Sequence, residues 1–217
     1  FTDGVNTFNG ADYCNSVYGD NNILVSVGNP IGVFYGYETK GVFATDAEAK
    51  NAGKEGYLYM LNAAGNKQNF TSGDVHFVDQ NGDDCIDERD KVILGNPNPD
   101  FYGNIFAALN WKNFTLDMGF NFSVGNDVYN YQRSILNSGS TFYNQQVAEV
   151  GHWRYEGHEA TLPKLAYGDP MGNNRFSDRW IEDGSYLRMK NLRMTYRIPV
   201  PESWTSWLQS MSVWGEA

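Results

Sequence analysis

The feature that most constrains the fold is a pair of alternating apolar runs around a two-residue polar step. In residues 101–111 every second residue is apolar or glycine: Phe101, Gly103, Ile105, Ala107, Leu109 and Trp111. After Lys112-Asn113 the alternation resumes with Phe114, Leu116, Met118, Phe120, Phe122 and Val124. A period of two on both sides of a two-residue turn predicts a hairpin of two long strands, 101–111 and 114–125.

Each predicted strand is about twice as long as the five or six residues usual in soluble proteins. The length matches the roughly 9–11 residues that a tilted strand needs to cross a bilayer. The alternative is a long hairpin of a soluble β-sandwich whose core takes the apolar face, and the hairpin alone leaves both interpretations open. In a membrane, the lipid-facing side chains are expected to be Leu109, Leu116, Met118, Phe120 and Phe122, with Asp117 and Asn121 facing the lumen.

A long polar stretch, residues 126–184, follows the hairpin. It is too long for an ordinary connection, and outer-membrane barrels combine short periplasmic turns with long outer loops. We therefore expect an extracellular loop. Its aromatic residues argue against disorder, and Trp153, Tyr155 and Trp180 are the expected contacts to substrate or partner, because large aromatics dominate such contacts.

Two further strands are predicted at 185–198 and 210–217. In the first of them the apolar positions change phase between Met189 and Leu192. The phase change indicates a β-bulge or a part of the strand that lies above the bilayer.

Composition excludes some functions. The 16 Lys and Arg residues are outnumbered by 26 Asp and Glu, so the acidic chain would repel a phosphate backbone and is not expected to bind nucleic acid. The dispersed histidines and the lack of a nucleophile or phosphate-binding motif predict that the protein is not an enzyme. Cys14 and Cys85 form one disulfide or stay unpaired.

Residues 1–100 read as loops and short strands, and they contain an acidic loop, Asp79–Asp90. Oxygen ligands of a calcium loop occupy positions 1, 3, 5, 7, 9 and 12. Here they would be Asp79, Asn81, Asp83, the carbonyl of Cys85, Asp87 and Asp90. Asp84 stands at position 6, where glycine is usual. Because the preceding residues predict a strand rather than a helix, we expect a structural calcium clip and not a sensor; the alternative is a solvated acidic turn without an ion.

Several segments together resemble one family. They are "IGVFYGYETKGVF" (Ile31–Phe43), "GDVHFVDQNGDDCIDERDKVILGNPNPDFYG" (Gly73–Gly103), "NFTLDMGFNFSVGNDVYN" (Asn113–Asn130) and "RFSDRWIEDGSYLRMKNLRMTYRIP" (Arg175–Pro199). Their order and spacing are similar to the C-terminal part of SusC/RagA-type TonB-dependent outer-membrane transporters of Bacteroidetes. The plug domain, the TonB box and most of the barrel have no counterpart here, so we expect the chain to be part of a longer protein.

The resemblance implies an all-β fold, part of a large antiparallel transmembrane β-barrel of about 22 strands with long extracellular loops. It implies import of glycans or peptides across the bacterial outer membrane, energised by the TonB system and assisted by a SusD-like surface lipoprotein, with lipid around the barrel. The alternative function is a soluble extracellular β-domain that is stabilised by calcium and binds glycans.

Overall fold

The computed structural model describes residues 13–15, 22–205 and 207–216, and the chain divides into two compact units. The loop unit contains Phe1–Pro97 and Asp127–Glu182, and the strand unit contains Asn98–Asn126 and Asp183–Ala217. Residues 127–182, predicted as a loop between two barrel strands, thus pack with the N-terminal residues. None of the described helices is both long and apolar enough to span a membrane.

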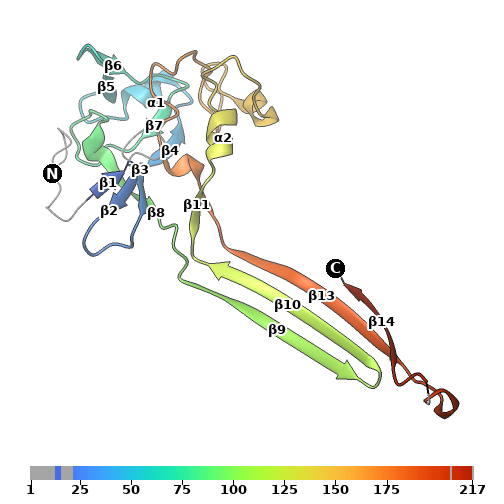
Figure 1. Cartoon of the computed structure of the whole chain (residues 1–217). Coiled ribbons are helices and arrows are strands. Elements are labelled where there is room, and N and C mark those ends of the chain that lie inside the picture. Colours follow the sequence, from blue (N-terminus) through green and yellow to red (C-terminus); the bar gives the residue numbers. More distant parts are fainter. Residues whose placement is uncertain (1–12, 16–21, 206, 217) are drawn as a thin grey trace. The chain divides into compact units, whose positions relative to one another are not determined.

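The loop unit is built from short elements (Figure 1). Its strands are β1 (Tyr13–Asn15), β2 (Ile23–Val25), β3 (Val33–Tyr37), β4 (Thr39–Val42), β5 (Tyr59–Leu61), β6 (Lys67–Asn69), β7 (Val75–Phe77), β8 (Lys91–Gly95), β11 (Asp127–Tyr129) and β12 (Ile181–Asp183). Its helices are α1 (Asp46–Lys50), α2 (Tyr131–Leu136) and the 3-10 turns η1 (Glu88–Asp90), η2 (Val147–Gly151) and η3 (Asp178–Trp180). The described strands of the loop unit form one four-stranded sheet, β1-β2-β3-β8, and the pairs β4-β7, β5-β6 and β11-β12.

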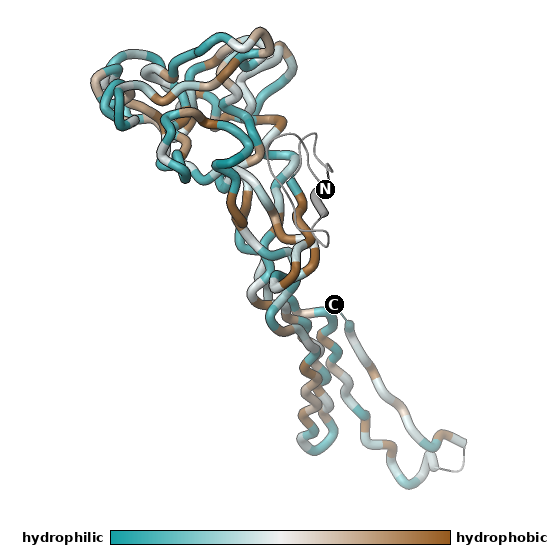
Figure 2. Tube along the Cα trace, turned by 90° about the vertical axis from the view of Figure 1, so that its left-hand side faces the viewer, coloured by the Kyte–Doolittle hydropathy of each residue, from teal (hydrophilic) through white to brown (hydrophobic). Residues whose placement is uncertain are grey.

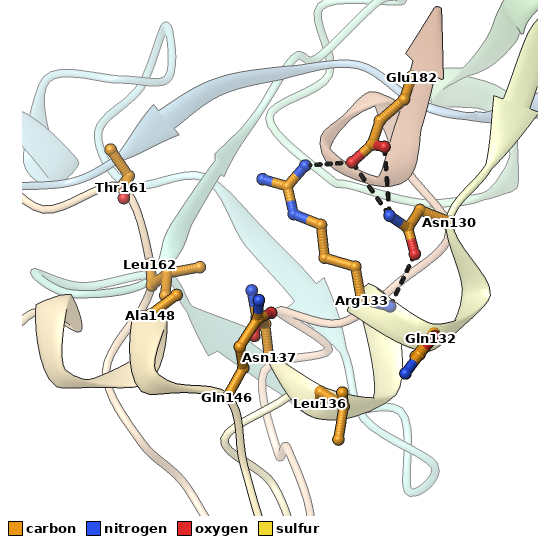
Figure 3. Close-up of a pocket in the computed structure, with 10 residues that line it drawn as sticks. All are labelled: Asn130, Gln132, Arg133, Leu136, Asn137, Gln146, Ala148, Thr161, Leu162 and Glu182. Carbon is orange, nitrogen blue, oxygen red and sulfur yellow. Dashed lines mark hydrogen bonds and ion pairs between the residues drawn. The ribbon is translucent and has the colours of Figure 1, made fainter. Parts of the chain in front are cut away.

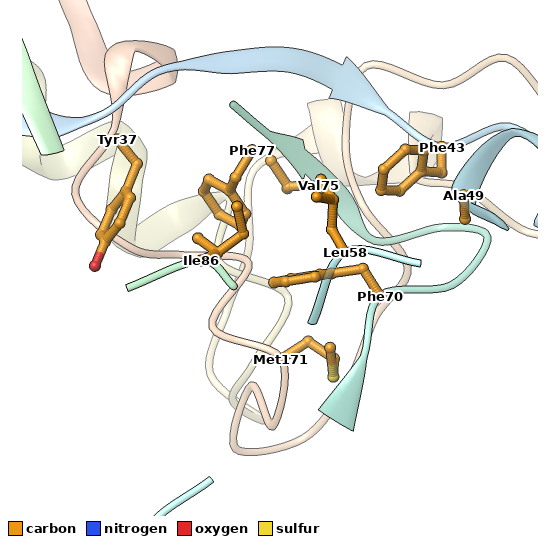
Figure 4. Close-up of a cluster of buried hydrophobic side chains, with 9 residues drawn as sticks. All are labelled: Tyr37, Phe43, Ala49, Leu58, Phe70, Val75, Phe77, Ile86 and Met171. Atoms are coloured by element: carbon orange, nitrogen blue, oxygen red, sulfur yellow. The ribbon is translucent and has the colours of Figure 1, made fainter. Parts of the chain in front are cut away.

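The core of the loop unit is a cluster of apolar side chains from separate short elements (Figure 4). Its members are Tyr37, Phe43, Ala49, Leu58, Phe70, Val75, Phe77, Ile86 and Met171. Phe77 lies at its centre and meets the rings of Tyr37 and Phe70 edge-on, with centroids 5.7 and 5.8 Å apart. Since burying a large apolar side chain contributes about 1.5–3 kcal/mol, this cluster holds together segments with little regular structure of their own.

A buried ion pair ties the second half of the loop unit to the first. Asp74 is fully buried, and its carboxylate accepts from Lys164 Nζ at 2.9 Å and from Asn173 Nδ2 at 3.0 Å. The backbone N–H of Thr71 donates to the same carboxylate at 2.9 Å. A buried charge is tolerated only when paired and hydrogen-bonded, so these contacts fix residues 164–173 against the turn before β7.

The strand unit is one antiparallel sheet in the order β14-β13-β10-β9 (Figure 1). The strands are β9 (Phe101–Trp111), β10 (Phe114–Val124), β13 (Tyr186–Ile198) and β14 (Met211–Glu216), and the 3-10 turn η4 (Glu202–Trp204) lies between the last two. The predicted hairpin around Lys112-Asn113 is confirmed. Lys112 has a φ of 51°, the left-handed conformation that a two-residue hairpin turn requires.

A β-bulge accounts for the change of phase in β13. Gly119 pairs with Asn191, but Phe120 pairs with Met189, so Lys190 is the extra residue. The bulge returns Leu187 and Met189 to the face that carries Leu192 and Met194. Of the two interpretations left open by the sequence, the bulge is therefore the one observed.

The register sorts the sheet into two unlike faces. One face carries the odd positions of β9, the even positions of β10, Leu187, Met189, Leu192, Met194, Tyr196 and Ile198 of β13, and Met211, Val213 and Gly215 of β14. None of the described residues that the register pairs on this face is charged, and the bulge residue Lys190 has no partner that assigns it to a face. The opposite face carries Asp117, Asn121, Arg188, Arg193 and Glu216, among others. Figure 2 shows the resulting alternation along the long strands.

The apolar face is not covered within the described residues. Ile105, Leu109 and Leu187 are 55, 62 and 71% exposed, and Phe120 is half-buried among its neighbours on the sheet. At the hairpin end Phe114 packs against Tyr196, with ring centroids 4.6 Å apart, and stacks on Trp111. An uncharged face ending in a cluster of aromatics is the arrangement of a sheet whose solvent is lipid.

A charge placed on either face provides a test. Phe120→Lys in the full protein should cost about 2–4 kcal/mol of unfolding free energy if the residue lies near the bilayer midplane, because the ammonium would enter hydrocarbon. Asn121→Lys, the matched control one residue away, should have little effect because it faces the other way. Denaturant unfolding in lipid vesicles measures both, and equal effects would contradict the assignment of the faces.

Candidate functional site

The acidic loop is folded by its own side-chain oxygens. The two carboxylate oxygens of Asp79 accept from the N–H groups of Gly82 and Asp84, at 2.6 and 2.8 Å. Asn81 and Asp83 each accept from the N–H group two residues ahead, both at 2.9 Å. Such local bonds are typical of Asx turns, and they give the loop the tight curvature that a calcium loop needs.

The last acidic residue of the loop closes it from the inside. Asp90 is fully buried, and its oxygens accept from the N–H groups of Gln80 at 3.0 Å and Asp87 at 2.8 Å. Burial raises the pKa of Asp90 above its ordinary value, although these N–H donors oppose the shift. Asp79 and Asp90, the first and last predicted ligands, therefore use their oxygens to hold the backbone.

Arg89 supplies a positive charge to the same loop. Its guanidinium lies 2.7 Å from the carboxylates of both Asp83 and Asp87. Burial acts to raise the pKa of Asp87, but the hydrogen bonds and charge of Arg89 outweigh it and leave that pKa below its ordinary value. In the part of the chain that the structure describes, no group of three or more His, Cys, Asp or Glu is arranged to hold a metal ion. The backbone fits a calcium loop better than the side chains do, and calcium binding stays a prediction.

Cys85, whose carbonyl is the seventh-position ligand of the prediction, has a free and buried thiol. Burial raises the pKa of this thiol, and the neighbouring Asp87 and Asp83 raise it further. The backbone N–H of Ile86 donates to the carbonyl of Tyr59 at 2.8 Å, which joins the loop to β5. The side chain of Cys14 lies outside the described residues.

Asp84 has a structural reason to stand where a calcium loop usually has glycine. Its φ of 63° is the left-handed conformation that this position requires and that Asp tolerates better than most residues. Its carboxylate accepts from the N–H groups of Lys54 at 2.6 Å and Glu55 at 2.8 Å, which hold its pKa below the ordinary value. A Cβ on Gly53 would lie 2.8 Å from this carboxylate. The acid thus joins the acidic loop to the turn after α1.

The three aromatic residues predicted as contacts occupy different environments. Trp180 is 1% exposed, its Nε1 donates to the carbonyl of Arg175 at 3.3 Å, and it packs inside the loop unit. The prediction of Trp180 as a surface anchor is therefore corrected, because an anchor has to be accessible. Trp153 is half-buried and donates from Nε1 to the carbonyl of Ala44 at 3.1 Å. Tyr155 is exposed.

Other aromatics of the loop unit are more accessible than those singled out from the sequence. Phe142 is 90% exposed and stacks on Tyr167, with centroids 4.7 Å apart, and Tyr143 is exposed beside it. In the sequence, Phe142 and Tyr143 stand next to each other in "TFY", between polar residues. They belong to no alternating or helical pattern of apolar residues. We call Phe142, Tyr143, Tyr155 and Tyr167 the exposed aromatics.

A polar groove of about 540 Å³ opens beside α2 (Figure 3). It is lined by Asn130, Gln132, Arg133, Leu136, Asn137, Gln146, Ala148, Thr161, Leu162 and Glu182. Arg133 Nη1 lies 2.7 Å from Glu182 Oε1, and Asn130 Nδ2 donates to both oxygens of that carboxylate at 3.2 Å. The hydrogen bonds from Arg133 and Asn130 lower the pKa of Glu182, so the pair stays ionised. The lining provides hydrogen-bond donors and acceptors.

Substitution of Asp84 tests its role in joining the two turns. Asp84→Gly should relax the left-handed backbone but leave the N–H groups of Lys54 and Glu55 without their acceptor, a loss of about 1–3 kcal/mol of local stability. Hydrogen exchange of residues 53–56 should therefore accelerate by about tenfold or more. Asp84→Asn, which keeps one acceptor oxygen, should show a smaller effect. Unchanged exchange in the glycine variant would exclude the role.

Comparison with known proteins identifies relatives, although no family model matches the chain. TonB-dependent receptor P3 of Formosa agariphila is 31% identical over 176 residues, covering 81% of this chain and 16% of that protein. TonB-dependent receptor P26 of the same organism is 29% identical over 184 residues, covering 84% of this chain and 17% of that protein. TonB-dependent receptor SusC of Bacteroides thetaiotaomicron is 29% identical over 128 residues, covering 55% of this chain and 11% of that protein. The chain spans about a sixth of the length of the first two relatives.

Solved structures share the fold. The RagAB peptide transporter matches with a TM-score of 0.63 at 20% identity, covering 95% of this chain and 20% of that one. The RagAB peptide importer in its closed-closed state matches with the same TM-score at 22% identity, covering 96% of this chain and 21% of that one. Together with the long strands and their two unlike faces, these relationships show that the chain is related to the TonB-dependent receptors of the bacterial outer membrane, SusC among them, and contributes antiparallel strands to a transmembrane β-barrel.

Proposed function

We propose that the protein containing this chain imports glycans or peptides across the outer membrane with energy from the TonB system. The observation that carries the proposal is the apolar face of the strand unit's sheet, which no described residue covers. The relationship to TonB-dependent receptors supports it. The relatives are named as receptors and transporters, and we assign this protein to transport rather than catalysis. RagAB is a peptide transporter, which supports peptides as one class of cargo.

A soluble glycan-binding β-domain, the alternative function, finds less support. Such a domain would bury Phe120 and Phe122 against a second sheet. In the described part of the strand unit there is a single sheet, and large apolar residues on its apolar face, such as Leu109 and Leu187, are exposed. In water this face would be a strong aggregation hazard, whereas in lipid it is the expected surface.

We further propose that the loop unit lies outside the cell and contacts a SusD-like lipoprotein or the cargo. The exposed aromatics support this, because Tyr and Phe supply large contact area at a modest loss of side-chain freedom. They replace Trp180 as candidate anchors, and Trp153 contributes by packing over Gly73 rather than by exposure. Deleting residues 144–155 would remove that packing, so point substitutions are the better probes.

The contact proposal is tested on the full transporter. Tyr155→Ser and the double variant Phe142→Ser/Tyr167→Ser should weaken lipoprotein association or cargo uptake, each by about tenfold if the site is an anchor. Leu61→Ser, an exposed apolar residue elsewhere in the loop unit, is the control. Co-purification and growth on the cargo measure the two effects. Normal association and normal uptake in both variants, at wild-type surface expression, would refute the contact.

A structural calcium ion in the acidic loop remains part of the proposal, held by Asp79, Asn81, Asp83, Asp87, Asp90 and the carbonyl of Cys85. Because Arg89 occupies two of the carboxylates, calcium has to displace it. Arg89→Met should therefore raise calcium affinity, and Asp83→Asn should lower it, from a starting dissociation constant of about 10⁻⁴–10⁻³ M typical of extracellular sites.

Hydrogen exchange of residues 79–90 in calcium and in a chelator measures this effect. Calcium should slow exchange in the wild type, and less calcium should be needed in Arg89→Met. If exchange is the same with and without calcium in both proteins, the loop is an acidic turn neutralised by Arg89 alone.

A further inference from the structure

The buried carboxylate of Asp74 brings together two side chains that have complementary reactivity. Its Oδ2 lies 2.9 Å from Nζ of Lys164, and its Oδ1 accepts from Nδ2 of Asn173 at 3.0 Å. Asp74 is 0% and Asn173 2% exposed, so the carboxylate and the carboxamide are shielded from water. One carboxylate therefore bridges an amine, which becomes a nucleophile when it loses a proton, and a carboxamide, which is an electrophile.

The backbone holds both of these side chains in place. The N–H group of Lys164 donates to the carbonyl of Gly73 at 2.7 Å. The N–H group of Asn173 donates to the carboxylate of Asp169 at 2.8 Å. A Cβ on Gly73 would lie 2.6 Å from the ring of Trp153 and 3.0 Å from Cβ of Lys164, so both side chains pack closely over this glycine. Fixed placement of two groups raises their effective concentration and favours a reaction between them.

The carboxamide of Asn173 is polarised by a neighbouring donor. Its Oδ1 accepts from the backbone N–H group of Val75 at 2.8 Å. A hydrogen bond at this oxygen stabilises the negative charge that the oxygen gains when a nucleophile attacks Cγ. Val75 and Met171 belong to the buried apolar cluster, and each lies within two residues of Asp74 or Asn173 (Figure 4). Apolar surroundings favour a proton transfer that leaves the amine and the carboxylate neutral.

We propose that Lys164 and Asn173 form an isopeptide bond, with Asp74 as the proton carrier. A proton passes from Nζ of Lys164 to Asp74, and the free amine attacks Cγ of Asn173 to form the Nζ–Cγ bond. The electron pair of the C=O bond moves to Oδ1 and returns as the Cγ–Nδ2 bond breaks. Nδ2 leaves as ammonium after Asp74 has relayed two protons to it from Nζ. Asp74 ends as the carboxylate, and no oxidant or further reactant is consumed.

The position of the lysine suits this reaction. Nζ of Lys164 also donates to Oγ1 of Thr71 at 2.9 Å and to the carbonyl of Ser72 at 3.3 Å, which keeps it beside the carboxylate. The Lys164 side chain is 30% exposed, so the ammonium that is released has a path to water. Dilution of the released ammonium then makes the bond permanent.

The bond closes residues 164–173 into a covalent ring. The ring contains Tyr167, one of the exposed aromatics. A covalent ring restricts the open forms of the segment it encloses, so Tyr167 is presented from a turn of fixed shape. The bond needs only the side chains described above, and it stands or falls independently of the proposed transport.

Trypsin digestion and mass spectrometry of the denatured full transporter test the bond. Trypsin does not cut after a lysine whose Nζ is part of an amide, and Lys164 is the single lysine or arginine between Arg154 and Arg175. Residues 155–175 should therefore appear as one peptide that is lighter by one ammonia. Complete cutting after Lys164 would show an ion pair alone and would overturn the proposal. Loss of ammonia from a peptide that is still cut there would indicate a cyclised asparagine and would overturn it as well.

Four variants assign the roles of the side chains. Lys164→Arg removes the nucleophile but keeps a cation beside Asp74, and Asn173→Leu removes the electrophile. Both should be cut after position 164 and should keep the mass of the ammonia. Asp74→Asn preserves the size of the side chain but cannot carry the proton, so the crosslinked fraction should fall at least tenfold. Asn174→Leu, one residue from the electrophile, is the matched control and should crosslink as the wild type does.

Crosslinking of Asp74→Asn at the wild-type level would overturn the role of Asp74 as the proton carrier. Hydrogen exchange separates the bond from the ion pair. Residues 165–172 should exchange at least tenfold faster in Lys164→Arg than in the wild type, because this variant keeps the charge pair and loses the ring. Equal exchange in the two proteins would show that the ion pair alone holds the turn, and would overturn the stiffening assigned to the ring.

Discussion

In hydrocarbon every backbone N–H and C=O group has to find its partner within the protein, and the strand unit is organised around this constraint. A single polar group left unpaired in lipid costs several kcal/mol, so the strands have to be long, antiparallel and continuously paired. The ladder between β9 and β10 runs without interruption from Trp111–Phe114 to Phe101–Val124. Side chains then need only alternate, with the apolar set facing outward and the polar set facing inward. The two faces stay distinct because continuous pairing keeps successive side chains on opposite sides of the sheet.

The bulge in β13 shows where the sorting of side chains between the two faces overrides continuous pairing. Without an extra residue, Leu187 and Met189 would stand on the polar face and Arg188 on the apolar face. The bulge at Lys190 shifts the register between Gly119 and Phe120. Gly119 allows this locally, because a Cβ there would collide with the side-chain oxygen of Asn191. One unpaired step in the ladder is thus accepted so that a full row of side chains lies on its proper face.

The strands were predictable because alternation is a local signal, and the hairpin and its turn follow from residues 101–124 alone. The burial and the contacts of individual side chains in the loop unit were not predictable in the same way. Trp180 and Tyr155 are both aromatics in a polar stretch, and only tertiary packing buries the first and exposes the second. The pair Lys164–Asp74 joins residues 90 positions apart, and nothing in the sequence near either residue indicates its partner.

The acidic loop was predictable in part. Ligand spacing correctly indicates a tightly curved loop with a left-handed residue at Asp84, but a calcium-loop pattern assigns no role to Arg89, which bridges Asp83 and Asp87.

The formal charge is divided unequally between the two units. The strand unit has five basic and five acidic residues, so the formal net charge of −10 belongs entirely to the loop unit. A sheet without net charge suits lipid, and an acidic surface repels polyanions. The neutral lining of the polar groove stands out against this acidic surface, because the surrounding field favours cations and the groove itself offers them no unpaired carboxylate. The lining of the groove therefore offers hydrogen-bond donors and acceptors rather than a net charge.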